Sequence, residues 1–295
     1  MFLLKKKSSK SLGVSFSIAE VIFTITIASI VKFISSELSV FMILFFRYLF
    51  CIPILLFTAF YERKFEAFQI TSKSGLILRT ITGLGSFGCL FGALQFIDLS
   101  LMTIILQTMP LFVTFLAPII IKEVVGWYRK IIALVGFIGV ILILNPFSEE
   151  WKNFGIILGV LSPFFGALMT IYVRKLGITD HPTSTALWYN IFGAVVFTIY
   201  CSSFLSFEAI SKNTWLILLV IGILASAQQI FMASSHKYAS ASGLAPIHYA
   251  NIPIGVFIGI LVFNETIDVN FITGTVLIIC STLFIIYREK TLNKD

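Results

Sequence analysis

The sequence predicts an all-α integral membrane protein with ten transmembrane helices, arranged as a 5+5 inverted repeat with both termini in the cytoplasm. Three observations predict this class: charge is scarce, long apolar runs fill the chain, and its two halves are similar. Of the 295 residues, 58% are hydrophobic and 12% are charged, whereas soluble domains carry about 25% charged residues. Such a chain cannot cover a water-soluble globule with polar side chains, so its solvent is lipid.

Ten apolar runs are long enough to cross a bilayer, since a crossing helix takes about 20 residues. Lipid offers the backbone no hydrogen bonds, and the alternating pattern of barrel strands is absent, so each run is expected to be a helix. In chain order the runs cover residues 14–34, 40–60, 75–97, 100–121, 128–147, 154–173, 184–206, 214–235, 242–263 and 270–287. Short joints with turn formers or charges separate them, and the tightest is Asp98-Leu99.

The basic residues predict the orientation of the chain. Of the 21 lysines and arginines, seventeen fall in the joints on one side or at the termini, and three, Lys32, Lys152 and Lys212, fall on the other side. Cytoplasmic loops carry the excess of positive charge, so the amino and carboxyl termini are expected in the cytoplasm. Arg47 alone is then placed inside a span. The net charge of +7 therefore labels topology and does not indicate a nucleic-acid partner.

A shift of 142 residues superposes several landmarks of the two halves, which predicts an internal repeat. The paired landmarks are Lys32 with Arg174, Phe46 with Trp188, Ser100 with Ser242, Glu123 with Glu265 and, one residue out of register, Pro110 with Pro253. The repeats are expected at 1–147 and 154–295. Because five crossings is an odd number, the two halves must have opposite orientations, which is the plan of many secondary transporters.

Several blocks resemble the drug/metabolite transporter superfamily and its EamA-type ten-helix members. They are Phe45-Phe46-Arg47-Tyr48-Leu49-Phe50, Pro110-Leu111-Phe112-Val113-Thr114, Lys122-Glu123, Asn264-Glu265 and Thr282-Leu283-Phe284-Ile285-Ile286-Tyr287. The resemblance covers nearly the whole chain. It is greatest to the branch that contains S-adenosylmethionine uptake carriers, with riboflavin carriers as neighbours, and it implies a transporter.

Arg47 is the sharpest candidate for substrate binding. It lies about eight residues into its span, where an arginine costs at least about 2.5–3.5 kcal/mol unless it faces protein or water. It could hold a carboxylate or phosphate of the substrate, or it could instead reach outward or bind carbonyls of a neighbouring helix. Glu20 is the proton-coupling candidate, because burial would let it carry a proton. The alternative for Glu20 is an interfacial pair with the basic amino terminus.

Other polar or aromatic residues inside spans are candidates for substrate recognition. Each of two spans has a central proline, which bends a helix and frees a carbonyl, and polar residues precede both prolines. These residues act either as recognition groups or as polar contacts between helices. The candidates are Gln107, His248, Tyr249 and Asn251 near the prolines, Tyr189 and Asn190 at the repeat equivalent of Arg47, and Trp188, which either stacks on an aromatic substrate or packs in the core.

The expected function is a secondary transporter of the bacterial inner membrane that moves a carboxylate-bearing or zwitterionic metabolite, S-adenosylmethionine-like or amino-acid-like, by alternating access. One alternative is a proton-coupled efflux carrier for hydrophobic cations or drugs, and another is a non-transporting membrane scaffold. Enzyme motifs, metal-binding spacings and cofactor motifs are absent from the sequence, so no catalysis and no cofactor are expected. The expected partners are a small-molecule substrate and the lipid bilayer, with a homodimer left open and nucleic acid excluded.

Overall fold

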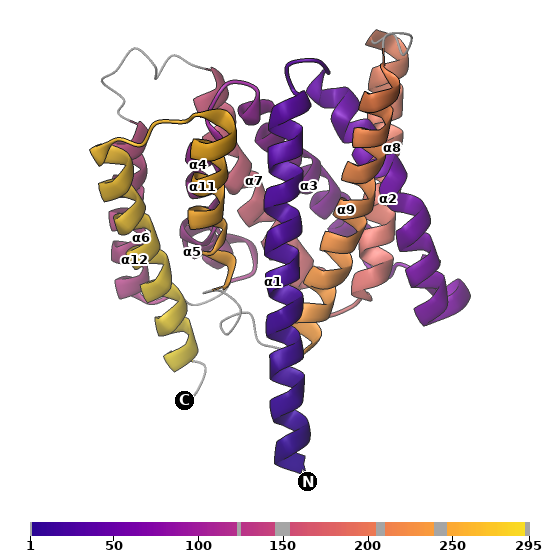
Figure 1. The fold of residues 1–295 in the computed structure, drawn as a ribbon. Coiled ribbons are helices and arrows are strands. Elements are labelled where there is room, and N and C mark those ends of the chain that lie inside the picture. The colour runs from indigo at the N-terminus through magenta and orange to yellow at the C-terminus, as the bar shows by residue number, and fades with distance from the viewer. Residues whose placement is uncertain (1, 123–124, 145–153, 205–209, 239–246, 293–295) are drawn as a thin grey trace.

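The fold is a bundle of helices, and both termini lie at the same end of it (Figure 1). The structure is a computed structural model that describes residues 2–122, 125–144, 154–204, 210–238 and 247–292, and within these ranges there is no β-strand. The helices are α1 (Phe2–Ile34), α2 (Val40–Arg63), the short 3-10 helix η1 (Lys64–Phe68), α3 (Lys73–Leu94), α4 (Leu99–Leu106), α5 (Met109–Ile120), α6 (Trp127–Leu144), α7 (Phe154–Leu176), α8 (Pro182–Phe204), α9 (Lys212–Tyr238), α11 (Asn251–Phe263) and α12 (Val269–Leu292).

Eight segments of the described residues are long and apolar enough to cross a membrane, with α4 and α5 together forming one of them. Two further apolar helices, α11 and the stretch Val269–Ile285 of α12, are shorter than the others. The all-helical membrane class predicted from the sequence is thus confirmed, while the count of ten crossings stays a prediction. Two of the repeat landmarks, Glu123 and Ser242, lie outside the described residues.

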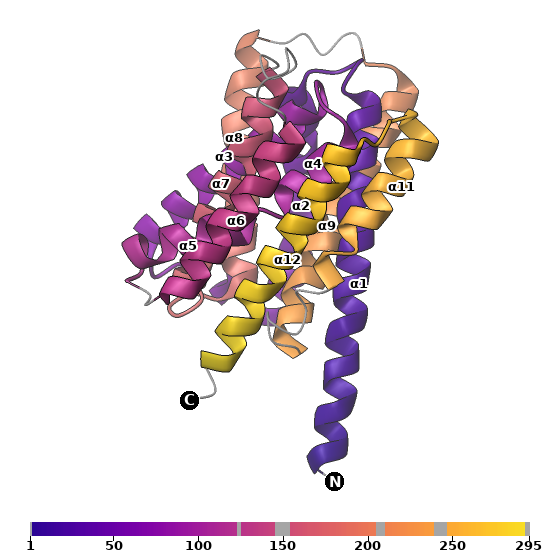
Figure 2. The same ribbon diagram turned by 90° about the vertical axis from the view of Figure 1, so that its left-hand side faces the viewer.

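The bundle has two opposite ends. We call the end that holds both termini the terminal face; it includes residues 64–72 and 177–181. The opposite end, the far face, includes residues 35–39, 95–98 and 264–268. Helix α1 runs from the terminal face to the far face, α2 returns, and α3 runs outward again (Figures 1 and 2).

The fourth predicted helix, 100–121, is in fact interrupted, which corrects the prediction of one bent helix. Helix α4 ends at Leu106 and α5 begins at Met109, with Pro110 in the first turn of α5. Proline has no N–H and its ring collides with the preceding turn, so the helix stops just before it. The structure similarly describes α11 only from Asn251, with Pro253 in its first turn. Both prolines therefore lie in the first turn of a helix, and the backbone N–H groups just before them bond to carbonyls three residues back instead of four.

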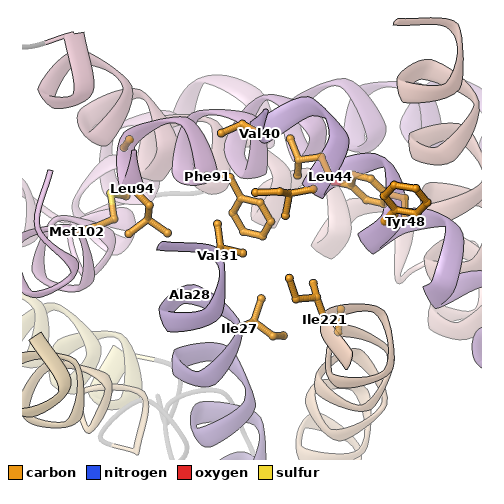
Figure 3. Packing of buried hydrophobic residues seen from close by; sticks show 14 of the residues in the cluster. Ile27, Ala28, Val31, Val40, Leu44, Tyr48, Phe91, Leu94, Met102 and Ile221 are labelled. Atoms are coloured by element: carbon orange, nitrogen blue, oxygen red, sulfur yellow. The ribbon is translucent and has the colours of Figure 1, made fainter. Parts of the chain in front are cut away.

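Apolar side chains from many helices meet in one core. Ile27 and Val31 of α1, Leu44 of α2 and Phe91 of α3 are all buried in it. Figure 3 shows them facing one another, with Ile221 of α9 completing the layer. The aromatic hydroxyl of Tyr48, at the edge of this cluster, is fully buried too. The core fixes α1, α2, α3 and α9 around the space that holds the candidate site.

Asp180 joins the two halves of the chain at the terminal face. Its carboxylate accepts hydrogen bonds from the backbone N–H of Thr71, at 2.5 Å, and of Ser72, at 3.1 Å, immediately before α3 begins. Thr179 Oγ1 donates a third bond, at 2.6 Å. Thr71 and Ser72 directly precede Lys73, the first residue of α3, so Asp180 fixes the start of α3 from a segment more than a hundred residues away.

Replacing Asp180 by asparagine is expected to destabilise the protein by about 1–3 kcal/mol, because an amide accepts the two N–H bonds less strongly and brings two donors of its own. Burial raises the pKa of Asp180, but the bonds from Thr179, Thr71 and Ser72 outweigh it and lower the pKa below 3.8. The carboxylate therefore stabilises the fold fully above that value, and the effect is lost as the pH falls through the lowered pKa. Melting temperatures of both proteins from pH 7 to pH 3 test this: the difference between them should shrink only at the acidic end.

Candidate functional site

A cavity lies between α1, α2, α3, α4, α9 and α11, inside the part of the bundle formed by the apolar segments. Its walls are mostly apolar, and its polar lining comes from five helices. The polar residues with an ionic or amide group are Arg47, Gln107, Gln228 and Asn251, and hydroxyls of Thr24 and Thr103 accompany them. A mostly apolar pocket with a few converging polar groups is the usual form of a small-molecule site.

Arg47 gives the cavity its charge. The side chain is only 1% exposed, and its guanidinium carbon lies 4.0 Å from the centre of the Phe87 ring and 4.9 Å from that of Tyr48. Nε and Nη1 have no hydrogen-bond partner among the residues that the structure describes. Stacking on aromatic faces compensates a buried cation only in part. The unpaired nitrogen atoms therefore leave N–H donors for an anion.

The position of Arg47 follows from the helices around it. Arg47 lies seven residues after the start of α2, about 10 Å along the helix axis, so it cannot easily reach the far face. Phe87 and Phe91 on one face of α3 cover its guanidinium from the side. The prediction that this arginine faces the protein interior is thereby supported over an outward-pointing side chain, while its role in binding is untested.

The two interrupted helices meet beside Arg47. Gln107, the residue at the break between α4 and α5, donates from Nε2 to the backbone carbonyl of His248, which precedes α11, at 3.4 Å. Gln107 and Asn251 both line the cavity, and Asn251 Oδ1 is buried without a partner in the described part of the chain. Helix interruptions near the middle of a membrane protein are where transporters commonly bind substrate, because unwound backbone supplies polar groups.

Gln228 of α9 and Thr24 of α1 complete the polar lining. Gln228 Nε2 donates to Thr24 Oγ1 at 3.2 Å. An amide in an otherwise apolar run is a weak signal on its own. Because α9 packs on α1, the Gln228 side chain lines the cavity.

Tyr189 and Asn190 of α8 lie near the cavity without lining it. The hydroxyl groups of Tyr189 and Tyr48 share a hydrogen bond of 2.7 Å, and the Tyr189 hydroxyl interacts electrostatically with Arg47. The predicted pseudo-symmetric partner of Arg47 is therefore its neighbour in space. Asn190 instead pairs with Gln229, the two amides donating to each other at 3.1 and 3.3 Å. Its polar atoms are thus engaged within the protein.

Glu20 and His248 form a second polar group. Glu20 is only 6% exposed, and its Oε2 lies 4.0 Å from His248 Nε2. The structure thus gives Glu20 a partner other than the basic amino terminus. Tyr249, the next residue, packs at the edge of the core.

Trp188 lies away from the cavity. Its indole nitrogen donates to the carbonyl of Phe68 at 3.0 Å, and its ring stacks on Phe192. Phe68 ends η1 at the terminal face, so the structure does not bring Trp188 to Arg47. The indole anchors α8 to the loop after α2.

A buried acid–base cluster at the far face was not anticipated. Glu265 accepts bonds from the backbone N–H of Leu99 and Ser100, at 2.7 and 2.9 Å, and from Ser100 Oγ at 2.5 Å. Lys32 Nζ lies 3.4 Å from Glu265 and donates to the carbonyl of Ile97 at 2.7 Å. Asn264, in the left-handed conformation with φ 54°, ends α11 and turns the chain back toward this cluster. The motif Asn264-Glu265 thus caps α4 and ties three segments together.

One statement about charges is corrected by the structure. Arg47 is not the only arginine within a span, because Arg79, expected in a joint, lies inside the apolar segment Lys73–Leu94. Arg79 already falls within the predicted run 75–97, and α3, which begins at Lys73, holds it six residues into the helix.

Comparison with known proteins shows what the chain is similar to. The model of the EamA-like transporter family matches residues 11–145 and 153–287. The S-adenosylmethionine uptake transporter of Rickettsia felis is 28% identical over 88% of this chain and 87% of its own length. The riboflavin transporter of Vibrio cholerae is 30% identical over 63% of this chain and 61% of its own length. A solved crystal structure shares the fold, with a TM-score of 0.64, 12% identity and coverage of 94% of this chain and 95% of its own.

Proposed function

Because this chain belongs to the EamA-like transporter family, we propose that it is a secondary carrier that moves a small carboxylate-bearing metabolite across the bacterial inner membrane by alternating access. Its place as a multi-pass protein of that membrane follows from the family and from its apolar helices. The observation that carries the proposal is the buried guanidinium of Arg47, two of whose nitrogen atoms have no partner among the described residues, in a cavity lined by amides.

The lining favours a zwitterionic or anionic substrate. A buried cation without a counter-ion is costly, and a bound carboxylate removes that cost. Within the described residues no carboxylate of the protein forms an ion pair with Arg47, so the substrate supplies the anion. S-adenosylmethionine fits this chemistry: its carboxylate would meet Arg47, the amides of Gln107 and Asn251 would bind its polar edges, and its adenine would rest on the wall around Phe91. Relatives named as S-adenosylmethionine uptake transporters support this choice.

Alternating access in this proposal rests on an inverted repeat of ten helices. The contacts between helices support it: α1 packs on α9 and α3 on α7, α2 packs on α8, α4 on α11, and α6 on α12. Exchanging the two halves turns the α1–α9 contact into the α7–α3 contact and leaves the other three unchanged, as a two-fold relation requires. The family model also matches each half separately. The excess of basic residues on the terminal face supports a cytoplasmic position for that face.

The first test is binding and transport by the purified protein. Among metabolites that include S-adenosylmethionine, riboflavin and amino acids, S-adenosylmethionine is expected to raise the melting temperature in detergent, because a ligand of the folded state stabilises it. Proteoliposomes should then take up radiolabelled S-adenosylmethionine. Binding and uptake of another metabolite would reject this substrate, and no transport of any solute would support a membrane scaffold.

Proton coupling is assigned in this proposal to Glu20, which is buried beside His248. Replacing Glu20 by glutamine, which cannot release a proton, is expected to abolish the stimulation of uptake by an imposed pH gradient. Exchange of internal for external substrate should persist, because exchange requires no net proton movement. Both rates can be measured in the same proteoliposomes. A variant still driven by the pH gradient would remove Glu20 from the coupling mechanism.

A second candidate function is proton-coupled efflux of hydrophobic cations, and the same buried Glu20 favours it. A cation would be bound by the Glu20 carboxylate rather than by Arg47. Efflux of a fluorescent lipophilic cation would then be lost in Glu20→Gln and retained in Arg47→Ala. If the protein instead takes up a carboxylate-bearing metabolite, binding of that metabolite should be lost in Arg47→Ala and retained in Glu20→Gln. The two variants therefore separate the functions.

A further inference from the structure

A second arginine inside a span, Arg79, lies on the side of the bundle toward the terminal face. Arg79 is six residues after the start of α3, about 9 Å from the terminal face along the helix axis. Its Nε and Nη1 are covered by protein and have no hydrogen-bond partner among the described residues. A cation held in this way costs free energy unless an anion or water reaches it. The carrier described above makes no use of Arg79.

Two tyrosines connect Arg79 to Arg47. The Arg79 guanidinium carbon lies 5.5 Å from the centre of the Tyr189 ring. The Tyr189 hydroxyl bonds to the Tyr48 hydroxyl at 2.7 Å, and the Tyr48 ring centre lies 4.9 Å from Arg47. Helix α2 starts at the far face and α3 starts at the terminal face. The contacts therefore form a continuous series of side chains from Arg47 to Arg79 across the middle of the bundle.

Two glycines make room for the tyrosine rings. A Cβ at Gly83, one turn beyond Arg79 on α3, would lie 2.7 Å from the Tyr189 ring, and a Cβ at Gly193 on α8 would lie 2.7 Å from the Tyr48 ring. Both rings therefore pack directly on the backbone of a neighbouring helix. The Tyr189 hydroxyl interacts electrostatically with both arginines and is paired with the Tyr48 hydroxyl.

We propose that Arg79 is a second anion site, which receives the substrate carboxylate from Arg47 when the carrier opens toward the terminal face. The inference rests on the carrier function proposed above and adds a residue to it. The Tyr48–Tyr189 pair is the barrier between the two positions: it breaks as the substrate passes, and each hydroxyl can then donate to the moving carboxylate. The ligand class is a carboxylate, the same group that Arg47 binds.

Transport from the two faces tests the proposal. In proteoliposomes of known orientation, the probe is radiolabelled S-adenosylmethionine, and its KM is measured on each face. Arg79→Gln is expected to raise the KM on the terminal face at least tenfold and to leave the KM on the far face within twofold. Lys175→Gln, which removes an exposed charge at the same end, is the matched control and should change neither. Equal effects on both faces, or none, would overturn the proposal.

A second measurement does not depend on the substrate. In a variant without Cys51, Cys89, Cys201 and Cys280, Arg79→Cys should react with an anionic, membrane-impermeant methanethiosulfonate added from the terminal face. A site that receives carboxylates must admit such a reagent. A folded protein that does not react there would show that Arg79 is packed away from any anion path and would reject the site. If the wild type fails to move S-adenosylmethionine but Arg79→Cys reacts, the substrate assignment fails and the anion site stands.

Discussion

Replacing Arg47 by alanine is expected to lower kcat/KM for S-adenosylmethionine uptake at least about 100-fold. Each hydrogen bond to a charged group contributes about 1.5–3 kcal/mol, and every 1.4 kcal/mol is about a factor of ten. Loss of two hydrogen bonds to the substrate therefore reaches this size. Initial uptake rates in proteoliposomes, with the amount of inserted protein determined in parallel, measure the effect.

The stability of Arg47 variants separates a binding role from a structural one. Because the guanidinium is buried without a counter-ion, Arg47→Leu is expected to raise the melting temperature of the substrate-free protein. An arginine that holds the helices together would give the opposite sign. Arg47→Lys keeps the charge and loses the planar fork that stacks on Phe87, so its uptake should lie between wild type and alanine. Wild-type KM in a folded Arg47→Ala protein would refute the binding role.

The part of the site that could be predicted from the sequence is the part with a strong local signal. Arg47 stands out because one charge in an apolar run has few explanations, and Pro110 and Pro253 mark helix interruptions because proline lacks a backbone donor. Gln107 and Asn251 were found through those prolines, and the structure places both beside Arg47.

The contacts between distant segments could not be predicted from the sequence pattern. Gln228 lines the cavity only because α9 packs on α1, and Glu265 meets Lys32 and Ser100 only because α11 packs beside α4. Hydropathy places a residue along the membrane normal but does not say which way it faces. Trp188 shows the same limit: its depth suggested the cavity, whereas its indole bonds to the loop at Phe68. Arg79 was counted with the basic residues of the preceding joint because it lies only about one turn inside the predicted run 75–97.

Replacing Glu265 by alanine is expected to cost about 3–5 kcal/mol, the penalty for breaking a buried ion pair by removing one partner. The Glu265 side chain is 2% exposed and that of Lys32 is 16% exposed. Without the carboxylate, the N–H groups of Leu99 and Ser100 lose their acceptor at the start of α4. Lys32 keeps the carbonyl of Ile97, the exposed Asp98 at 3.9 Å and the ring of Phe263. Thermal unfolding in detergent should show a large drop in the melting temperature.

Asp98→Ala is the matched control, since Asp98 is 57% exposed and lies 3.9 Å from the same lysine. An exposed pair of this kind contributes about 0–1 kcal/mol, so its melting temperature should stay close to wild type. The cluster ties α1 and α4 to the loop after α11, and those segments must separate for a substrate to enter from the far face. Glu265→Ala should therefore also raise the reactivity of a cysteine placed at Ala28, a cavity residue, toward a reagent added from that face. Unchanged stability together with unchanged reactivity would show that Glu265 neither holds the segments together nor closes the far face.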